Sequence, residues 1–238
     1  MFELLELLSF GDAGWGDELL KGLGVTISLA LVTAPFAIIF AFLIAWAKES
    51  PNKLLRIFGR SYTTLFRSLP EILTILILYY QLQNGVNYLI SFFSPDFTVN
   101  IDPFFAGAVA LTLVFSALGS EVVRAAYQSV GKSQLEGAYS IGLPPKKAFF
   151  LVMLPQMWRH ILPAFGNLWL LLLKDTSLVS IIALSDVVRY ANMAIATTKE
   201  PFFFYTVIAL IYVTLAFISG RIQTVLEKRA SQNLAGGR

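Results

Sequence analysis

Long apolar runs separated by shorter polar segments dominate the pattern of this 238-residue chain. Five runs extend over about residues 26–46, 69–90, 103–126, 162–184 and 201–220. A helix needs roughly 20 residues to cross a bilayer, and these runs have about that length. No polar stretch is long enough to bury a separate core. The pattern therefore predicts one all-α domain, residues 1–238, built as an integral membrane bundle of five transmembrane helices.

Local signals indicate where two of these helices begin. Asp102 followed by Pro103 is typical of an N-cap and first helical position. Ser68 and Glu71 have the spacing of a capping box ahead of the second run. Before them, residues 48–68 interleave cations with apolar positions at a helical period. That arrangement predicts an amphipathic helix lying in the membrane interface.

The polar segment 127–160 has turn signals of its own. A short helix is expected over residues 134–141, with Gly142 suited to the position just after its end. Pro144 and Pro145 then favour the start of a second amphipathic helix. Two short helices that project from a membrane bundle make a shape suited to docking on a partner, although a plain connecting loop has the same pattern.

The cations are distributed unevenly over the two sets of span ends. Only Lys21, Arg189 and Lys199 lie on one side. Thirteen lie on the other: Lys48, Lys53, Arg56, Arg60, Arg67, Lys132, Lys146, Lys147, Arg159, Arg221, Lys228, Arg229 and Arg238. Because lysine and arginine near span ends favour the cytoplasmic side, the N-terminus is expected outside and both segment 127–160 and the C-terminus in the cytoplasm.

Composition excludes several kinds of chemistry. There is no cysteine, so a disulfide or a thiol nucleophile is impossible, and the single histidine, His160, excludes a multi-histidine metal site within this chain. The net charge of +3 follows from the bias of cations toward one side, so nucleic-acid binding is not indicated. Gly131-Lys132-Ser133 resembles the end of a phosphate-binding loop, but alanine stands where its first glycine belongs and no strand is expected before it.

Two charged residues fall near the middle of the fourth run. Lys174 and Asp175 are adjacent, so on a helix they point about 100° apart and cannot pair well with each other. Each is expected either to find a partner on another helix or subunit or to contact a substrate. The hydroxyls of Thr176 and Ser177 extend this polar face.

Two glutamates also leave alternatives open. Glu121 is either half of an i,i+3 ion pair with Arg124 or part of a passage that attracts a cationic ligand. Glu71 is either the capping-box residue of its helix or a ligand contact.

Several segments together resemble a known family. Glu136-Gly137-Ala138, Gly142 and the later Leu154-Pro155 resemble the EAA loop of ABC importer permeases, with Gly137 in place of the second alanine. The segments SLPEILTILILYYQL, SEVVRAAYQSV and LLLKDTSLVSII resemble motifs of the polar amino acid branch. Within that branch, the chain is similar to the histidine/lysine-arginine-ornithine and opine permeases.

The resemblance implies a fold, a function and partners. It implies the type I ABC importer permease fold in a bacterial inner membrane, and a channel-forming subunit that imports polar amino acids, basic ones or opines. The implied partners are an ABC ATPase dimer, a second identical or homologous permease, a periplasmic substrate-binding protein, the amino acid and membrane lipid. ATP and Mg²⁺ would be bound by the ATPase, so this chain is expected to be no enzyme and to hold no cofactor.

Within that resemblance, the loop residues Glu136, Gly137, Ala138 and Gly142 would form the helix that couples to the ATPase. Two other classes of protein remain as alternatives. An ion-coupled secondary transporter would use Glu121 or Asp175 as a proton or cation relay, although its usual inverted repeat is not found. A membrane scaffold that transports nothing would tolerate Glu136→Lys.

Overall fold

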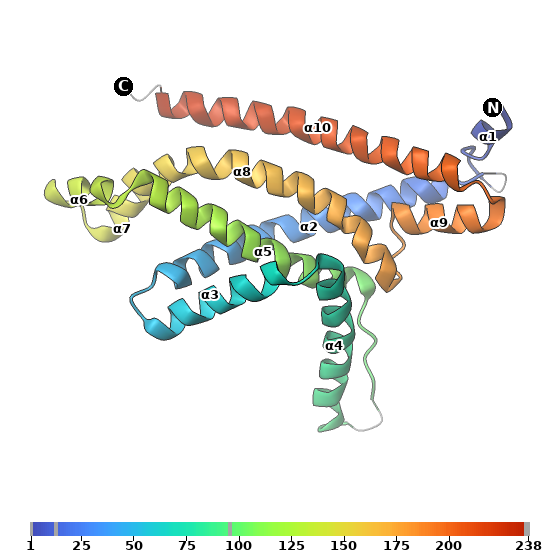
Figure 1. Ribbon diagram of the computed structural model, residues 1–238, viewed down its shortest axis with the longest axis horizontal. Coiled ribbons are helices and arrows are strands. Elements are labelled where there is room, and N and C mark those ends of the chain that lie inside the picture. Colours follow the sequence, from blue (N-terminus) through green and yellow to red (C-terminus); the bar gives the residue numbers. More distant parts are fainter. Residues whose placement is uncertain (1, 12–13, 95–96, 236–238) are drawn as a thin grey trace.

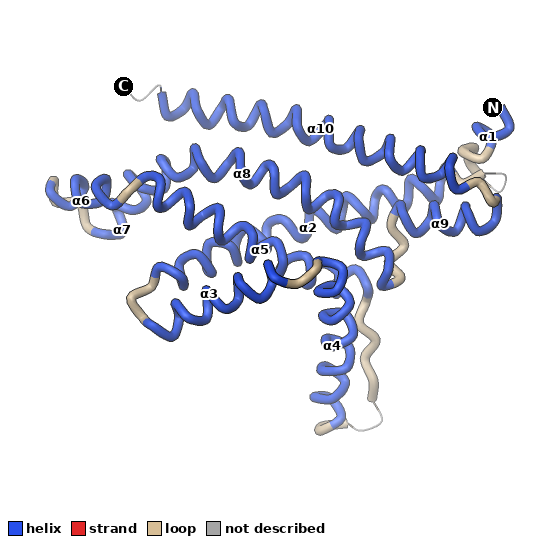
Figure 2. Tube along the Cα trace, viewed as in Figure 1, coloured by secondary structure: helices blue, strands red, loops and turns tan. Residues whose placement is uncertain are grey.

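The computed structural model describes residues 2–11, 14–94 and 97–235, and these form helices and loops without a strand (Figures 1 and 2). The α-helices are α1 Phe2–Glu6, α2 Gly16–Glu49, α3 Lys53–Ser68, α4 Glu71–Ser91, α5 Pro103–Val130, α6 Lys132–Ser140, α7 Pro145–Ala148, α8 Leu154–Asp175, α9 Val187–Thr198 and α10 Pro201–Ala235. A π-helical turn, Phe149–Met153, precedes α8, and a 3₁₀ helix, Thr176–Ile182, follows it.

Four long helices, α2, α5, α8 and α10, run side by side along the longest axis of the molecule (Figure 1). We call the end that carries α6 and α7 the hairpin end, and the opposite end, which carries α1 and α9, the α9 end. Among the described residues, four stretches are long and apolar enough to cross a membrane: Gly16–Glu49, Pro103–Val130, Pro145–Ile182 and Pro201–Ala230. They contain four of the five predicted spans.

The second predicted span is different. Helices α3 and α4 meet this length and apolarity test only as a pair bent by 112°, so the described chain has four spans, or five if the bent pair counts as one. Figure 1 shows α4 projecting away from the bundle. The break falls at Leu69, whose extended backbone is the conformation that a following proline imposes.

The predicted amphipathic helix is present as α3, which packs alongside α2 and α5, and the Tyr62 hydroxyl donates a hydrogen bond to the carbonyl of Leu113 at 2.9 Å. The predicted capping box does not form. Ser68 ends α3, Pro70 occupies the N-cap of α4, and no side chain caps that helix. By contrast, the Asp102 carboxylate accepts hydrogen bonds from the amides of Phe104 and Phe105, as the N-cap prediction requires.

Small residues let the central helices approach closely. The buried face of α2 includes Ala30, Ala37 and Ala41, and that of α5 includes Ala117 and Gly119, where an added Cβ would lie 2.9 Å from that of Ala41. Such residues are enriched where membrane helices pack, because they bring the backbones together. Larger apolar side chains of α2 point outward and are exposed on the single chain: Leu31, Phe36, Ile39, Phe40 and Leu43. A helix that is apolar on all sides suits a membrane span.

Helix α9 was not anticipated from the sequence. The Asp186 side chain caps it by accepting a hydrogen bond from the Arg189 amide at 2.9 Å. Val187, Ala191 and Ala194 pack in a cluster with Leu19 of α2 and with α10. This cluster joins the start of α2 to the start of α10 at the α9 end. Helix α10 also continues to Ala235, well past the predicted end of the fifth span, so the basic tail up to that residue is helical.

Candidate functional site

The hairpin end presents the loop that resembles the EAA motif. Helix α6 carries Glu136 and Gly137 on its exposed side, while Ala138 is only 4% exposed and packs inward. The helix ends at Ser140, and the turn after it passes through Gly142, whose φ of +82° is strained for any residue with a side chain. The amide of Gly142 donates to the carbonyl of Tyr139 at 2.9 Å, and that of Leu143 donates to Ala138 at 3.1 Å. The predicted helix and its glycine stop are therefore both present.

An exposed apolar patch lies beside these residues. Ile141 is 78% exposed and Tyr139 is 45% exposed. Pro144 and Pro145 then start α7, as the sequence predicted. The π-helical turn brings the chain to Pro155, which occupies the first turn of α8 and needs no amide partner there. The hairpin thus exposes the Glu136 carboxylate and the large side chains of Tyr139 and Ile141.

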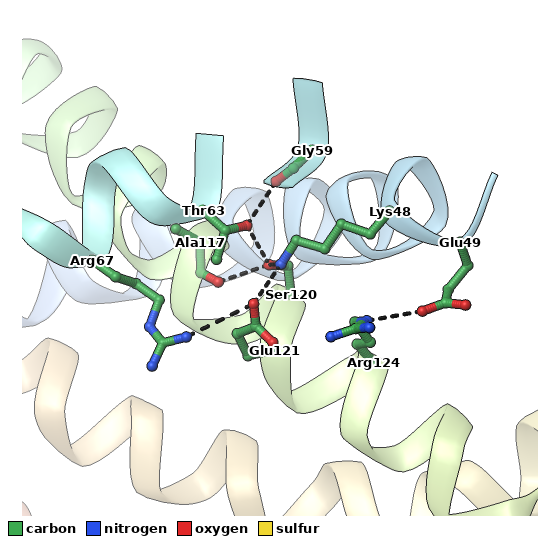
Figure 3. Close-up of polar contacts among 9 residues, drawn as sticks. All are labelled: Lys48, Glu49, Gly59, Thr63, Arg67, Ala117, Ser120, Glu121 and Arg124. Atoms are coloured by element: carbon green, nitrogen blue, oxygen red, sulfur yellow. Dashed lines mark hydrogen bonds and ion pairs between the residues drawn. The ribbon is translucent and has the colours of Figure 1, made fainter. Parts of the chain in front are cut away.

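A polar network lies between α2, α3 and α5 near the hairpin end (Figure 3). Lys48 Nζ contacts Glu121 Oε1 at 2.8 Å and donates to the Ser120 hydroxyl, also at 2.8 Å. The Ser120 hydroxyl lies 3.3 Å from that of Thr63 on α3. Arg67 of α3 approaches Glu121 at 3.8 Å. These contacts join α5 to the consecutive helices α2 and α3, whose contacting residues come more than fifty positions earlier in the chain.

The predicted pair between Glu121 and Arg124 does not form. Arg124 Nε instead contacts Glu49 Oε1 at 2.8 Å, and Glu121 faces the two cations described above. The reason is tertiary, because α2 and α3 bring cations closer to Glu121 than its own helix does. Sequence reasoning counted Lys48 among the cations at the span ends and missed it as the buried partner of Glu121. Its position at the end of a long apolar run was a usable signal, because an ionisable side chain next to such a run often faces another helix.

The second group of candidate residues meets at the bend between α3 and α4. Asp175 ends α8 with only 8% of its surface exposed, and the Glu71 carboxyl at the start of α4 interacts with it electrostatically. Asp175 Oδ2 is buried and has no hydrogen-bond partner in the described part of the chain. The structure thus brings together two candidates that lie far apart in sequence, and both are acidic.

The neighbours of Asp175 behave differently from one another. Lys174 is exposed and forms no ion pair with a described residue. The Thr176 hydroxyl donates to the Leu173 carbonyl at 2.7 Å, and that of Ser177 donates to the Lys174 carbonyl at 2.6 Å. Both hydroxyls therefore bond to carbonyls of the last turn of α8, where the chain changes to a 3₁₀ helix.

The described residues contain no cluster suited to a metal ion. Within these ranges, no group of three or more histidine, aspartate or glutamate side chains is close enough to hold one. Gly131-Lys132-Ser133 connects two helices, α5 and α6, rather than following a strand.

The fold and these polar sites define a class of protein: a polytopic membrane subunit with a projecting helical hairpin and charges buried between its spans. Residues 34–232 match the family described as binding-protein-dependent transport system inner membrane component, and the chain belongs to that family. It is therefore a permease subunit of a transport system.

Relatives that match over nearly their full length are permeases for opines and for histidine, lysine, arginine and ornithine. The chain is 34% identical to the octopine transport permease OccQ of Rhizobium meliloti, over 98% of both chains. It is 37% identical to the nopaline transport permease NocQ of Agrobacterium fabrum, over 97% of this chain and 98% of that one. The histidine/lysine/arginine/ornithine permease HisQ of Salmonella typhimurium is 35% identical, over 92% and 95% of the two chains.

Solved structures agree with this placement. A chain in the crystal structure of an amino acid ABC transporter with histidines superposes with a TM-score of 0.78 at 29% identity, and the match covers 90% of this chain and 95% of that one. A chain of the MetNI methionine transporter has a TM-score of 0.69 at 14% identity, over 89% and 95% of the two chains, and shares the fold.

Proposed function

We propose that this chain is a channel-forming subunit of an ATP-driven importer for polar amino acids, with basic amino acids or opines as its substrates. The observation that carries the proposal is the full-length similarity to octopine, nopaline and histidine/lysine/arginine/ornithine permeases. The required partners are a periplasmic substrate-binding protein, a second identical or homologous permease and an ABC ATPase dimer. That dimer binds ATP and Mg²⁺, so this chain supplies no catalytic residue and no cofactor.

The orientation is part of this proposal. The hairpin end faces the cytoplasm of the bacterial inner membrane, and the α9 end faces the periplasm. The positive-inside rule supports this, because the cations gather at the hairpin end. Cysteine labelling tests it, since the natural chain has no cysteine to interfere. A cysteine at Ile141 should react with a membrane-impermeant maleimide only in inside-out vesicles, and one at Lys199 only in right-side-out cells. Reversed labelling would overturn the orientation.

We further propose that Glu136, Gly137, Ala138 and Gly142 form the coupling element that fits against the ATPase. Ala138 fixes α6 to the bundle, and Gly142 ends the helix so that Glu136, Tyr139 and Ile141 remain exposed for contact. Movement of the ATPase would then pass through this hairpin into α5 and α8.

Co-purification tests the coupling element. Glu136→Lys should release most of the ATPase from the detergent-solubilised complex and uncouple ATP hydrolysis from uptake. Glu200→Lys makes the same charge reversal at the exposed α9 end and should retain the ATPase. If both variants kept the ATPase and transported normally, the hairpin would not be the docking element. A Glu136→Lys variant without any functional loss is what a membrane scaffold predicts.

For substrate recognition, we propose that Glu71 and Asp175 attract the cationic group of a basic amino acid. Two neighbouring carboxyl groups, one with an unpartnered buried oxygen, form an arrangement that a cation would stabilise. Thr176 and Ser177 are assigned to shaping the backbone there. Glu121 is assigned to the network with Lys48, and Lys174 to the exposed surface, so neither is proposed as a substrate contact.

Uptake by the complete importer in proteoliposomes tests both the activity and the site. Wild type should take up arginine or lysine only with ATP and the binding protein present, and an ionophore that collapses ion gradients should not stop it. Uptake that followed the ion gradient without an ATPase would favour the secondary transporter. Asp175→Asn and Glu71→Gln should raise the KM for lysine about tenfold, the effect of losing one charge-assisted contact. Asp102→Asn removes a carboxylate charge but keeps an N-cap, so it should leave the KM unchanged.

A further inference from the structure

Two adjoining cavities open between α2, α3 and α5 at the hairpin end, with volumes of about 350 and 540 Å³. Lys48, Arg60 and Arg124 line both. The smaller one reaches Lys132 at the start of α6, and the larger one reaches Arg67 and Glu121. The cavities therefore connect the polar network of Figure 3 with the beginning of the hairpin.

Positive charge is in excess along these walls. Six cations face two carboxylates, those of Glu49 and Glu121; the cations are Lys48, Arg56, Arg60, Arg67, Arg124 and Lys132. Glu121 forms ion pairs with Lys48 and Arg67, and Glu49 forms one with Arg124. The other three cations, Arg56, Arg60 and Lys132, form no ion pair with any residue that the structure describes. The cavities consequently hold a local charge that an anion would neutralise.

Helix α3 also carries exposed apolar side chains. Ile57 is 50% exposed and lies one helical turn before Arg60, so it borders the cationic wall. Leu54, Phe58 and Leu65, which are 77%, 58% and 54% exposed, cover the opposite side of this helix. A cationic cavity at the end of a membrane bundle, walled by a helix with an exposed apolar side, matches a molecule that has a phosphate head and a hydrocarbon body. Basic pockets between membrane helices bind acidic lipid headgroups in this way.

We propose that these joined cavities bind a phosphate group, held by Arg56, Arg60 and Lys132, and that an anionic phospholipid supplies it. Free inorganic phosphate has the same anionic chemistry and is the other source, but the apolar face of α3 favours the lipid. Because Lys132 begins α6, the bound phosphate joins α3 to the coupling hairpin. This site is separate from Glu71 and Asp175, and it does not depend on which solute is transported.

Native mass spectrometry of the purified permease complex tests the proposal, with phosphatidylglycerol and phosphatidylcholine as probes. Phosphatidylglycerol should bind in preference to phosphatidylcholine. Arg60→Gln and Lys132→Gln should each weaken that binding about fivefold, the effect of one cation near an anionic lipid. Lys53→Gln removes one charge from the same helix α3 but lies outside both cavities, so it should bind like wild type. Arg60, Lys132 and Lys53 are all exposed, so these variants should fold.

A second measurement separates the two sources of phosphate. Inorganic phosphate is titrated into the complex in phosphatidylcholine nanodiscs while its thermal stability is followed. Stabilisation that Arg60→Gln removes and Lys53→Gln retains would assign the site to free phosphate and overturn the lipid as its source. A lipid preference lost equally in all three variants, or no preference and no phosphate effect at all, would overturn the site itself.

Discussion

The Nζ of Lys48, at the end of α2, lies 2.8 Å from Glu121 Oε1 in the second half of α5. The lysine side chain is 2% exposed and the glutamate side chain 35% exposed, so the cation is enclosed while its partner keeps some contact with the outside. The Ser120 hydroxyl accepts a second hydrogen bond from the same ammonium. This pair therefore ties the end of α2 to α5.

Removing the partner of Lys48 should therefore destabilise the permease. Glu121→Gln leaves an enclosed ammonium without a counter-charge and should cost about 1–3 kcal/mol, between the values for exposed and fully buried pairs. Glu49→Gln removes a carboxylate from the more exposed pair with Arg124 and should cost less than about 1 kcal/mol. Thermal unfolding in detergent measures both. Equal losses in the two variants would contradict a special role for the Lys48 pair.

Two glycines of the hairpin, Gly137 and Gly142, should respond in opposite ways to alanine. Gly142 has a φ of +82°, so Gly142→Ala should strain the turn by about 1–2 kcal/mol even though a Cβ has open space there. Gly137 lies inside α6 with nothing near an added Cβ, so Gly137→Ala should strengthen the helix by up to about 1 kcal/mol. Hydrogen exchange of the hairpin amides should be faster in the first variant and slower in the second. The same direction of change in both would refute this account.

Close packing at the α9 end should tolerate no side chain at Gly22. A Cβ there would lie 2.7 Å from backbone atoms of Asp186 and Val187, which cannot rotate away. Gly22→Ala should push α9 from α2 and cost about 1–3 kcal/mol. Gly24→Ala, two residues along the same helix, meets nothing within 4 Å and serves as the control. A melting temperature that falls in the control as much as in Gly22→Ala would indicate a general effect of alanine in α2.

The buried N-cap of α9 should make stability depend on pH. Burial raises the pKa of the Asp186 carboxyl to about 6, although hydrogen bonds from backbone amides, first that of Arg189, act to lower it. In the unfolded chain the pKa returns to about 3.9. The folded state therefore binds more protons between these values, so the contribution of this group to stability falls as pH rises from about 4 to about 6 and is flat above that.

Asp186→Asn tests this dependence, because asparagine still caps the helix but cannot ionise. The variant should lose the decline between about pH 4 and 6 and should be more stable than wild type at pH 7, by up to about 3 kcal/mol for a shift of about two pKa units. Thermal melts of both proteins over this range give the comparison. Parallel curves at every pH would mean that Asp186 titrates normally in the folded protein.

Much of the architecture was accessible from the sequence because it depends on short-range rules. The length of each apolar run gave the long helices, and Asp102-Pro103 and Gly142 gave helix ends, since caps and glycine stops are local. The motifs around Glu136 gave the family, and the family match confirmed it. Helix α9 was missed although Asp186 is a residue type that favours an N-cap and eight of the twelve residues of the helix are apolar. At twelve residues it is too short to cross a membrane, and the search was for runs long enough to do so.

Pairing between distant residues could be decided only by the tertiary structure. From the sequence, Arg124 was a possible partner for Glu121 because it lies one helical turn away. In the structure, Glu121 pairs instead with Lys48, which lies on another helix more than seventy residues earlier. Likewise, Glu71 resembled a helix cap until the bend at Leu69 placed it against Asp175. Sequence periodicity fixes which face a residue occupies on its own helix. Which charges then meet depends on how helices cross and where the chain bends, and close packing of small residues between helices sets those angles.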